Sequence, residues 1–405
     1  MNSFLKRLFH GDTIIWIVFF TLCIGSVLIM YSASSTLAHR ATNHHSAPIL
    51  QHILYLAIGI GLAYGIHRFI PYQIVRLLGF VGLATAFVLL VLTPFIGIRI
   101  NEATRWIEIF GIRFQPSEIA KLSLIIVVAD FMSRIKDDDP NSQKTWFRLI
   151  MIISGAICLL IFSDNASTAI LLFGVVFIMM FIGRISPKRL GIIALTGLLV
   201  CASVYGVGKV NTSIFGSAMQ NRTTTFANRI DRFFVSDDNA EKFVMNDRNR
   251  QLQNSKIAIA RGGTTPIGVG IGNSVQRDYL PLAYSDFIYA IVIEEGGLFI
   301  GIILILLYLI LLFRAGQIAT KCNAVFPALL VFGLSLMIVM QAFISMAVAT
   351  GLGPVTGQPL PLISRGGTSI VITSVYFGII LGITKYIKES QQKQTEGTVE
   401  TVEVE

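Results

Sequence analysis

The stretch from Gly262 to Gly297 holds residues whose types suit ligand chemistry. A glycine-rich run passes through Asn273, Gln276 and Arg277 and leads to Asp286, where a hydrophobic segment opens. Glycines permit positive φ angles and close approach of the backbone to a ligand. An acid at a helix start lies at the positive end of the helix dipole. We therefore expect this stretch to hold a polar ligand, with Asp286 in the first turn of a helix.

Arginines accompany this acid on one side of the predicted topology: Arg105, Arg261, Arg277 and Arg365. A planar guanidinium is suited to bidentate recognition of phosphate. An acid among arginines at the mouth of an apolar bundle suggests a substrate with an anionic head and a membrane tail. Channels and transporters place their charges nearer the bilayer midplane. The alternative for Asp286 is a helix-start acid that only stabilises the dipole.

Three further ionisable residues fall in or beside apolar segments. Glu118 and Lys121 are three residues apart and so lie on one helix face. Ionisable groups within a membrane segment face the bundle interior or a water-filled cavity, and they usually pair. An ion pair that stabilises the cavity and a contact with substrate are both open readings. Asp164 lies in a tight turn on the same side as Asp286.

The elements that must position these residues are membrane helices. The chain has 405 residues, of which 54% are hydrophobic and 14% charged. This composition indicates an all-α integral membrane protein. About ten apolar segments have roughly spanning length: 13–32, 50–67, 74–96, 117–135, 149–163, 167–183, 190–208, 284–313, 323–350 and 367–387.

These segments predict a division of the chain into five parts. They are an N-terminal lead (1–12), transmembrane helices 1–7 (13–208), one large external loop (209–283), transmembrane helices 8–10 (284–388) and a disordered tail (389–405). In the large loop we expect short surface helices near 229–234 and 255–260. Loop 97–115 suits an interfacial segment, and loop 351–369 a non-helical segment lining a cavity.

If the ten segments cross the membrane one after another, the Lys and Arg residues of the short loops fall on one side of it. This bias predicts that both termini are cytoplasmic. The net charge of +9 belongs largely to this topology signal, so a nucleic-acid partner is not expected. The four cysteines form no CxxC or Cys/His cluster, which argues against a disulfide framework or a structural zinc site.

Several ordered motifs carry a resemblance to a known family. They are Trp106-Ile107, Phe114-Gln115-Pro116-Ser117-Glu118-Ile119-Ala120-Lys121, Gly268-x-Gly-x-Gly-Asn273-Ser274-x-Gln276, Leu280-Pro281, Asp286-Phe287-Ile288, Thr356-Gly357-x-Pro359-Leu360-Pro361 and Ser364-x-Gly366-Gly367-Thr368-Ser369. Together they resemble the SEDS family of bacterial cell-wall polymerases, typified by FtsW, RodA and SpoVE. The Gly-Asn-Ser-x-Gln form is closest to the division branch.

The resemblance implies a peptidoglycan glycosyltransferase that polymerises lipid II at the outer face of the bacterial inner membrane. It implies that Asp286 is the essential acid and that Glu118 and Lys121 are a cavity pair. Asp164 matches a family acid, although Ser163–Thr168 departs from the usual Pro-Asp-x-Gly-Thr. The usual Glu-x-His-Thr before the essential acid is replaced by Leu282–Ser285.

The motifs also place Asn273, Gln276, Ser364 and Thr368 at the substrate site or cavity. The implied partners are a class B penicillin-binding protein, which is a transpeptidase, and other membrane proteins of the division machinery. In the mechanism that we expect, Asp286 takes a proton from the acceptor sugar. Arg261, Arg277, Arg365 or a divalent cation (Mg or Mn) offsets the charge of the leaving group. The alternatives are a lipid II flippase and a non-catalytic scaffold that recruits the transpeptidase.

Overall fold

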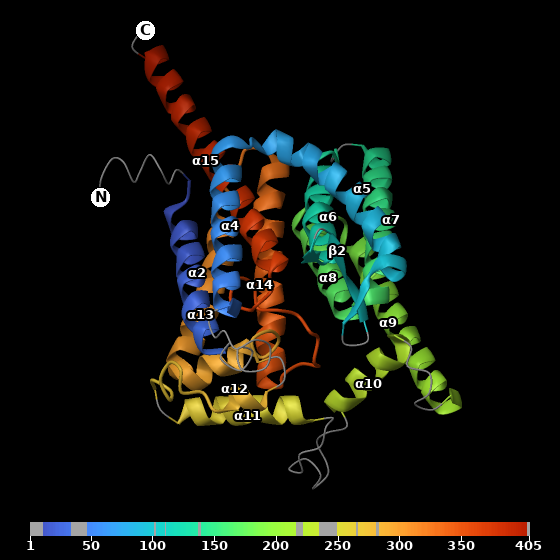
Figure 1. Cartoon of the computed structure of the whole chain (residues 1–405). Coiled ribbons are helices and arrows are strands. Elements are labelled where there is room, and N and C mark those ends of the chain that lie inside the picture. The colour runs from blue at the N-terminus through green and yellow to red at the C-terminus, as the bar shows by residue number, and fades with distance from the viewer. Residues whose placement is uncertain are drawn as a thin grey trace.

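The computed structural model describes residues 11–33, 47–100, 103–109, 111–136, 139–215, 222–234, 249–264, 266–280 and 283–402. Helices dominate this part of the chain (Figure 1). They are α2 (Thr13–Ala33), α4 (Ala47–Phe69), α5 (Tyr72–Ile96), α6 (Pro116–Ser133), α7 (Pro140–Asp164), α8 (Ala166–Ile182), α9 (Pro187–Phe215), α10 (Arg222–Phe234), α11 (Arg250–Gly263), α12 (Gln276–Tyr279), α13 (Ile288–Ala319), α14 (Val325–Thr350) and α15 (Thr368–Val402).

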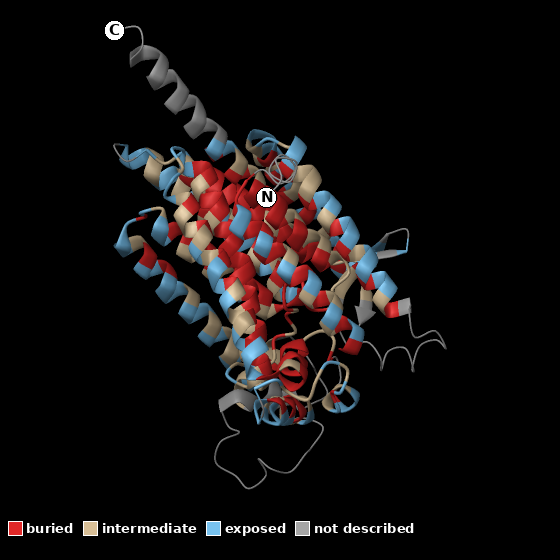
Figure 2. Ribbon diagram, turned by 90° about the vertical axis from the view of Figure 1, so that its left-hand side faces the viewer, coloured by how far each residue is buried: buried red, intermediate tan, exposed pale blue. Residues whose placement is uncertain are grey.

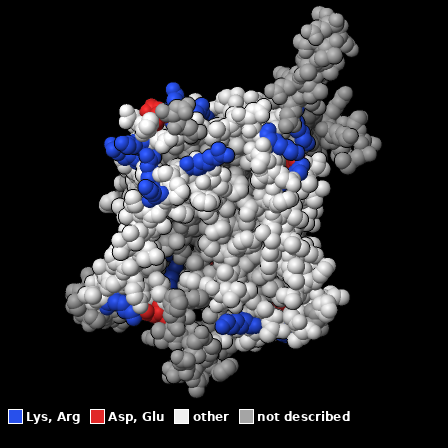
Figure 3. All heavy atoms as spheres, turned by 180° about the vertical axis from the view of Figure 1, so that it is seen from behind, with Lys and Arg blue, Asp and Glu red and all other residues white. Residues whose placement is uncertain are grey.

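Eight of the described helices are long and apolar enough to cross a membrane: α2, α4, α5, α7, α9, α13, α14 and α15. Two others complete the predicted ten. The apolar helix α8 has only 17 residues, and α6 carries Glu118, Lys121 and Asp130 within its 18 residues. Figure 3 shows Lys and Arg gathered toward the two ends of the molecule, with a band almost free of charge between them. The chain is a multi-pass membrane protein, as predicted.

The core of the bundle lies around α6 and α14. Nearly every residue of α6 is buried. In the 18-residue apolar stretch of α14, 78% of the residues are buried as well. Figure 2 shows the buried residues filling the centre, with exposed residues on the outer helices. Pro116 begins α6 at its first position and Glu118 lies in its first turn, and both residue types suit a helix start. The polar residues of α6 are therefore placed inside the protein.

A small antiparallel sheet replaces the interfacial segment expected at 97–115. Its strands are β1 (Ile98–Ile100), β2 (Ala103–Ile109) and β3 (Ile112–Phe114), in that order. In this segment β-branched isoleucines alternate with polar residues, a pattern typical of strands. Glu108 on β2 lies opposite Arg113 on β3, and the two side chains form an ion pair of 2.8 Å. The sheet brings Arg105 toward the bundle.

One end of the bundle carries the surface helices expected in the large loop. The two expected helices are α10 and α11, and they lie across this end together with the short α12, which was not expected (Figure 1). α9 runs to Phe215 instead of ending at 208. At the opposite end, Arg314 of α13 binds the carboxylate of Asp12 at 2.7 Å, and the backbone N–H of Asp12 donates to Thr384 of α15. The start of α2 and the membrane-spanning part of α15 therefore meet at one end.

Two further expected boundaries are wrong. The helix expected from 284 begins at Ile288, so Asp286 precedes it, and the first turn of α13 contains no acidic residue. The tail expected to be disordered from Glu389 continues as helix α15 to Val402. Its Glu, Gln and Lys residues are good helix formers, so an existing helix propagates through them.

Candidate functional site

A cavity of about 420 Å³ opens between α4, α6, α8 and the sheet. Two non-helical segments also line it, one just before α13 and one just before α15. Four of the predicted site residues line it: Arg105, Glu118, Asp286 and Arg365. The other lining residues are Gln51, His52, Tyr55, Trp106, Arg113, Gln115, Asn165, Thr168, Tyr284, Ser285, Gly357, Gln358, Pro359, Gly366, Gly367 and Ser369. The cavity therefore combines two carboxylates, three guanidinium groups and uncharged hydrogen-bonding side chains.

The loop after α14 holds Asp286 in place. Ser364 accepts a hydrogen bond from the N–H of Leu360 at 2.8 Å, and its hydroxyl donates to the carbonyl of Ser285 at 2.6 Å. The N–H of Arg365 donates to the carbonyl of Tyr284 at 2.9 Å. Asp286 is thus fixed at the cavity wall by contacts with loop 351–367.

That loop has no helix or strand, as expected for 351–369, and its later part, 356–364, is mostly buried among the helices. Its carbonyl groups find side-chain partners on three helices. Pro359 accepts from Gln341 of α14, and Pro361 accepts from Tyr308 of α13. Leu362 accepts from Ser26 of α2 at 2.6 Å. Non-helical backbone at membrane depth requires such partners.

The electrostatic surroundings of Asp286 favour a proton acceptor. Burial raises the pKa of Asp286 above its ordinary value. The hydrogen bond from Ser285, at 3.0 Å, and the charges of Arg105 and Arg229 lower this pKa, but they do not cancel the effect of burial. A carboxylate with a raised pKa is a better general base near neutral pH than an ordinary one.

Arg105 lies beside this acid. A Cβ atom built on Gly357 would lie 3.7 Å from Oδ2 of Asp286 and 3.8 Å from Nη1 of Arg105, so both side chains border the same glycine. Nε of Arg105 donates to the backbone carbonyl of Asp164 at 2.8 Å. Asp164 itself lines a small adjoining pocket of about 20 Å³, together with Arg105 and Arg229. Asp164 therefore orients Arg105 through its backbone.

Glu118 and Lys121 form the predicted ion pair. Nζ of Lys121 lies 2.7 Å from Oε1 of Glu118 and 2.9 Å from Oε1 of Gln341. The lysine side chain is 1% exposed and the glutamate side chain 8% exposed. Glu118 lines the cavity, whereas Lys121 lies behind it. The pair joins the cavity wall to α14.

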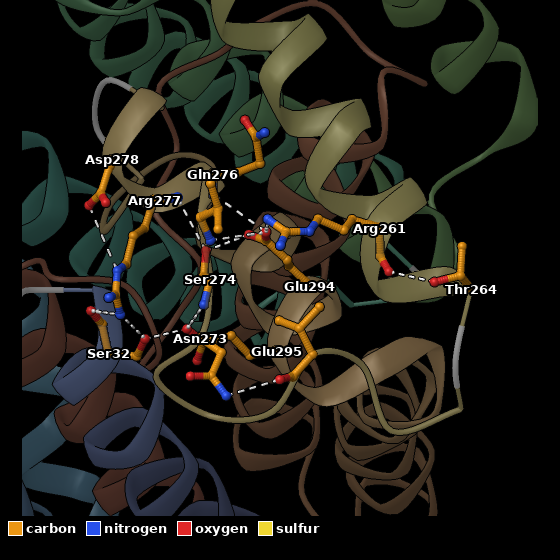
Figure 4. Close-up of polar contacts among 12 residues, drawn as sticks. Ser32, Arg261, Thr264, Asn273, Ser274, Gln276, Arg277, Asp278, Glu294 and Glu295 are labelled. Carbon is orange, nitrogen blue, oxygen red and sulfur yellow. Dashed lines mark hydrogen bonds and ion pairs between the residues drawn. The ribbon is translucent and has the colours of Figure 1, made fainter.

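The glycine-rich stretch does not reach this cavity. Arg261, Asn273, Gln276 and Arg277 gather instead around Glu294 and Glu295 of α13 (Figure 4). Arg261 lies 3.4 Å from Glu294. Arg277 donates to the hydroxyl of Ser32 at 3.0 Å, and Ser32 donates to Glu295. The expectation that Arg261 and Arg277 accompany Asp286 is wrong, since Arg261 pairs with the buried Glu294 and Arg277 contacts Ser32 and Asp278.

The polar groups around those carboxylates come mostly from the loop that ends in α12. Ser274 donates its hydroxyl to Glu294 and its N–H to Glu295. The N–H of Gln276 donates to Glu294 at 3.4 Å, while the amide of Asn273 donates to the carbonyl of Val269 at 3.1 Å. Backbone N–H groups thus replace water around two acids in a helix. This arrangement does not resemble a path of charges through the bundle.

Close packing explains three glycines of this stretch, Gly262, Gly268 and Gly297. α13 is broken at Gly297, which has φ +75 and ψ 174. The freed carbonyls of Glu294 and Glu295 accept hydrogen bonds from Val269 and Gly270 at 2.9 and 3.0 Å. A Cβ on Gly262 would lie 1.9 Å from the carbonyl oxygen of Ile293. Gly262 and Gly268 therefore seat the loop against α13, where we expected the glycines to hold a ligand.

Thr368, the remaining predicted residue, begins α15 and has a buried hydroxyl without a hydrogen-bond partner among the described residues. It does not line the cavity, but Ser369, next in sequence, does. Sequence reasoning missed Gln51, His52 and Tyr55 of α4, which form one side of the cavity. The sequence signal that could have revealed them was the polar pair Gln51-His52 at the start of an otherwise apolar segment.

A metal site was predicted only as an option. Among the described residues, no group of three or more His, Cys, Asp and Glu side chains could hold a metal ion. Of the carboxylates that line the cavity, Glu118 is already paired with Lys121. A divalent cation that offsets the charge of the leaving group stays a prediction.

Comparisons with known proteins agree with this architecture. The chain is 32% identical over 372 residues to a protein of Alcanivorax borkumensis named probable peptidoglycan glycosyltransferase FtsW, with 89% of each chain covered. Its fold is similar to that of a chain from a peptidoglycan synthase complex that coordinates polymerization and crosslinking. That comparison has a TM-score of 0.70 and 22% identity over 93% of this chain and 98% of the other.

A variant of the rod shape determining protein RodA of Thermus thermophilus is also similar in fold. The TM-score is 0.64 and the identity 21%, over 93% of this chain and 97% of the other. The sequence model of a family described as cell cycle protein, FtsW/RodA/SpoVE, matches residues 12–389. The predicted resemblance is confirmed, and the chain belongs to the FtsW/RodA/SpoVE family of cell cycle proteins.

Proposed function

We propose that this protein is a peptidoglycan glycosyltransferase that polymerises lipid II into β-1,4 glycan strands. The observation that carries the proposal is a carboxylate of raised pKa, Asp286, in a cavity that also holds Arg105, Arg113 and Arg365. A general base and phosphate-binding groups in one cavity are what transfer from a lipid pyrophosphate requires. Relatives named probable peptidoglycan glycosyltransferase FtsW support the same activity.

The place of action in this proposal is the outer face of the bacterial inner membrane, with both termini cytoplasmic. Asp12, at the start of α2, contacts Arg314 and Thr384 at the end of the bundle opposite α10–α12. The Lys and Arg residues of the short loops support a cytoplasmic position for that end. Relatives that carry the name FtsW and the Gly-Asn-Ser-x-Gln form support a role in septal wall synthesis.

In the proposed reaction, the carboxylate of Asp286 takes the proton of the acceptor sugar's 4-hydroxyl. The oxygen attacks C1 of the donor sugar, and the bond from C1 to the pyrophosphate oxygen breaks. The electron pair leaves with undecaprenyl pyrophosphate. One displacement inverts the anomeric centre, so an α-linked donor gives a β bond.

Positive charge for the leaving group comes from Arg105, Arg113 and Arg365 in this scheme. Arg365 donates to the amide oxygen of Gln51 at 3.1 Å and lies over the ring of Tyr284, 5.7 Å from its centroid. Arg113 is more than half exposed at the rim. These guanidinium groups take the role that we expected of Arg261 and Arg277, because a preorganised cation stabilises charge where it develops.

A class B penicillin-binding protein is the partner we propose, since the glycan must be cross-linked where it is made. The fold match to a chain of a peptidoglycan synthase complex supports such a pairing. Other division proteins of the membrane are proposed as partners on the same reasoning.

The decisive experiment compares wild type with Asp286→Asn. Each purified protein is incubated with labelled lipid II and the cognate transpeptidase, with moenomycin present to silence polymerases of the other type. We expect long glycan chains from wild type and none from Asp286→Asn. Asp278→Asn is the matched control, because Asp278 is a more exposed acid of the neighbouring segment that does not line the cavity. This control should polymerise normally.

Glycan synthesis by Asp286→Asn would remove the acid from its role. If no protein polymerises although all are folded, flipping of lipid II in vesicles distinguishes a flippase from a scaffold. A flippase would use buried charges along a path through the bundle, whereas Glu294 and Glu295 are bound by Ser274, Ser32 and backbone N–H groups.

A further inference from the structure

His52 is a buried imidazole in the cavity that the proposed reaction does not use. It lies near the start of α4 and is 2% exposed. Its side chain lines the same cavity as Asp286. An imidazole early in an apolar membrane helix is costly unless its two ring nitrogens have partners.

Ser26 fixes which ring nitrogen carries the proton. Its Oγ lies 2.8 Å from Nε2 of His52 and 2.6 Å from the carbonyl oxygen of Leu362. A hydroxyl has one hydrogen, and a carbonyl can only accept. The hydrogen of Ser26 therefore goes to Leu362, and Ser26 accepts the N–H of Nε2. In the neutral ring, the lone pair is then on Nδ1.

Nδ1 lacks a partner in the described part of the chain, and it is buried. Turning the ring would give up the contact of Nε2 with Ser26, which Leu362 of loop 351–367 holds in place. A buried acceptor without a partner is unfavourable. A ligand in the cavity that supplied a donor would remove this cost.

The chemistry of that donor follows from the ring's charge. Arg365 donates to Gln51, the residue before His52, so positive charge already lies on this side of the cavity. A neutral imidazole that presents a lone pair accepts a hydrogen bond and does not bind phosphate. Hydroxyl and amide N–H groups are the donors that an N-acetylated sugar offers.

We propose that Nδ1 of His52 accepts a hydrogen bond from a sugar hydroxyl or an acetamido N–H of the substrate in the cavity. His52 is thus a substrate-binding residue, with Ser26 as its positioning residue. The inference rests on the proposed function, because it takes the occupant of the cavity to be a lipid-linked amino sugar.

Two substitutions separate the two ring nitrogens. The amide of Gln in His52→Gln ends at the ε position, so it can keep the contact with Ser26 but lacks an acceptor at Nδ1. The amide of Asn in His52→Asn ends at the δ position and keeps an acceptor there, but it loses Ser26. Loss of one hydrogen bond predicts a rise of about three- to tenfold in KM for lipid II in His52→Gln, with little change in kcat.

We expect His52→Asn to show the smaller rise in KM and the lower thermal stability in detergent. The opposite order, with His52→Gln close to wild type, would mean that His52 only tethers Ser26. Ser26→Ala adds an independent variant in case His52→Gln does not fold. It frees the ring to change tautomer and should raise KM by about twofold or more; an unchanged KM would contradict the inference.

Direct binding of lipid II to wild type and variants in detergent repeats the comparison without turnover. If wild type binds lipid II but does not polymerise it, the proposed function fails while the ranking of variants still decides the role of His52. If wild type polymerises and all variants bind and turn over alike, the inference about His52 fails alone.

Discussion

Replacing Lys121 with Met tests whether the ion pair with Glu118 holds the inner wall of the cavity. Nζ of Lys121 contacts Glu118 at 2.7 Å and Gln341 at 2.9 Å, and the lysine is 1% exposed. Methionine keeps much of the length of the side chain but removes the ammonium group. The carboxylate of Glu118 then loses its counter-ion in an apolar surrounding. Breaking a buried pair from one side costs about 3–5 kcal/mol of unfolding free energy, and we expect a loss in that range.

The double variant Glu118→Gln/Lys121→Met should recover much of this loss, because it leaves no unpaired buried charge. A buried pair replaced by neutral groups of similar volume is often close to neutral in stability. We therefore expect a coupling energy of about 2 kcal/mol or more between the two substitutions. Glycan synthesis should be lower in the double variant than in wild type, since the double variant lacks the carboxylate of Glu118, which lines the cavity.

The measurement is the free energy of unfolding of wild type, both single variants and the double variant in one detergent. Lys256→Met is the matched control, because Lys256 is exposed on α11, and its loss should change stability by about 0.5 kcal/mol or less. Additive effects of the two substitutions, or a Lys121→Met loss as small as the control's, would refute the reasoning.

Two further predictions concern charge and backbone. Activity should fall as pH drops through the raised pKa of Asp286, because the protonated acid cannot accept a proton. Arg229→Gln should move this acidic limb of the kcat/KM profile to higher pH, since Arg229 lowers that pKa; an unmoved limb would mean that the limb belongs to another group. Gly297→Ala should destabilise the protein by roughly 3 kcal/mol, because a Cβ there would lie 2.2 Å from the carbonyl of Pro266 at φ +75. Gly316→Ala is the control on the same helix, because a Cβ there meets nothing within 4 Å, and it should be neutral or stabilising. Thermal unfolding of both variants and wild type measures the difference.

Contacts within one helix were the most predictable part of the site. The spacing of Glu118 and Lys121 sets their pairing wherever the helix lies, and Pro116 sets where it begins. Apolar length likewise predicted the membrane helices. Both inferences depend on local geometry, which the order of residues contains.

Contacts between distant segments were not predictable in the same way. Topology placed Arg261, Arg277, Arg365 and Asp286 on one side of the membrane, but it could not say which acid each arginine meets. Arg261 pairs with Glu294, which the sequence placed inside a helix. The helix start at Ile288 was missed because loop 351–367, distant in sequence, holds Ser285 and Tyr284 in turns that precede the helix.

The position of Arg229 has a consequence for control of the enzyme. This residue lies on α10, which packs against α9. α9 is an outer helix, and only 11% of the residues in its 18-residue apolar stretch are buried. Part of the electric potential at Asp286 is therefore supplied by the periphery of the protein. A lipid or protein that shifted α9 and α10 outward would withdraw that cation, and proton affinity at the reactive carboxylate would rise. The pKa of Asp286 would in this way depend on where α10 lies.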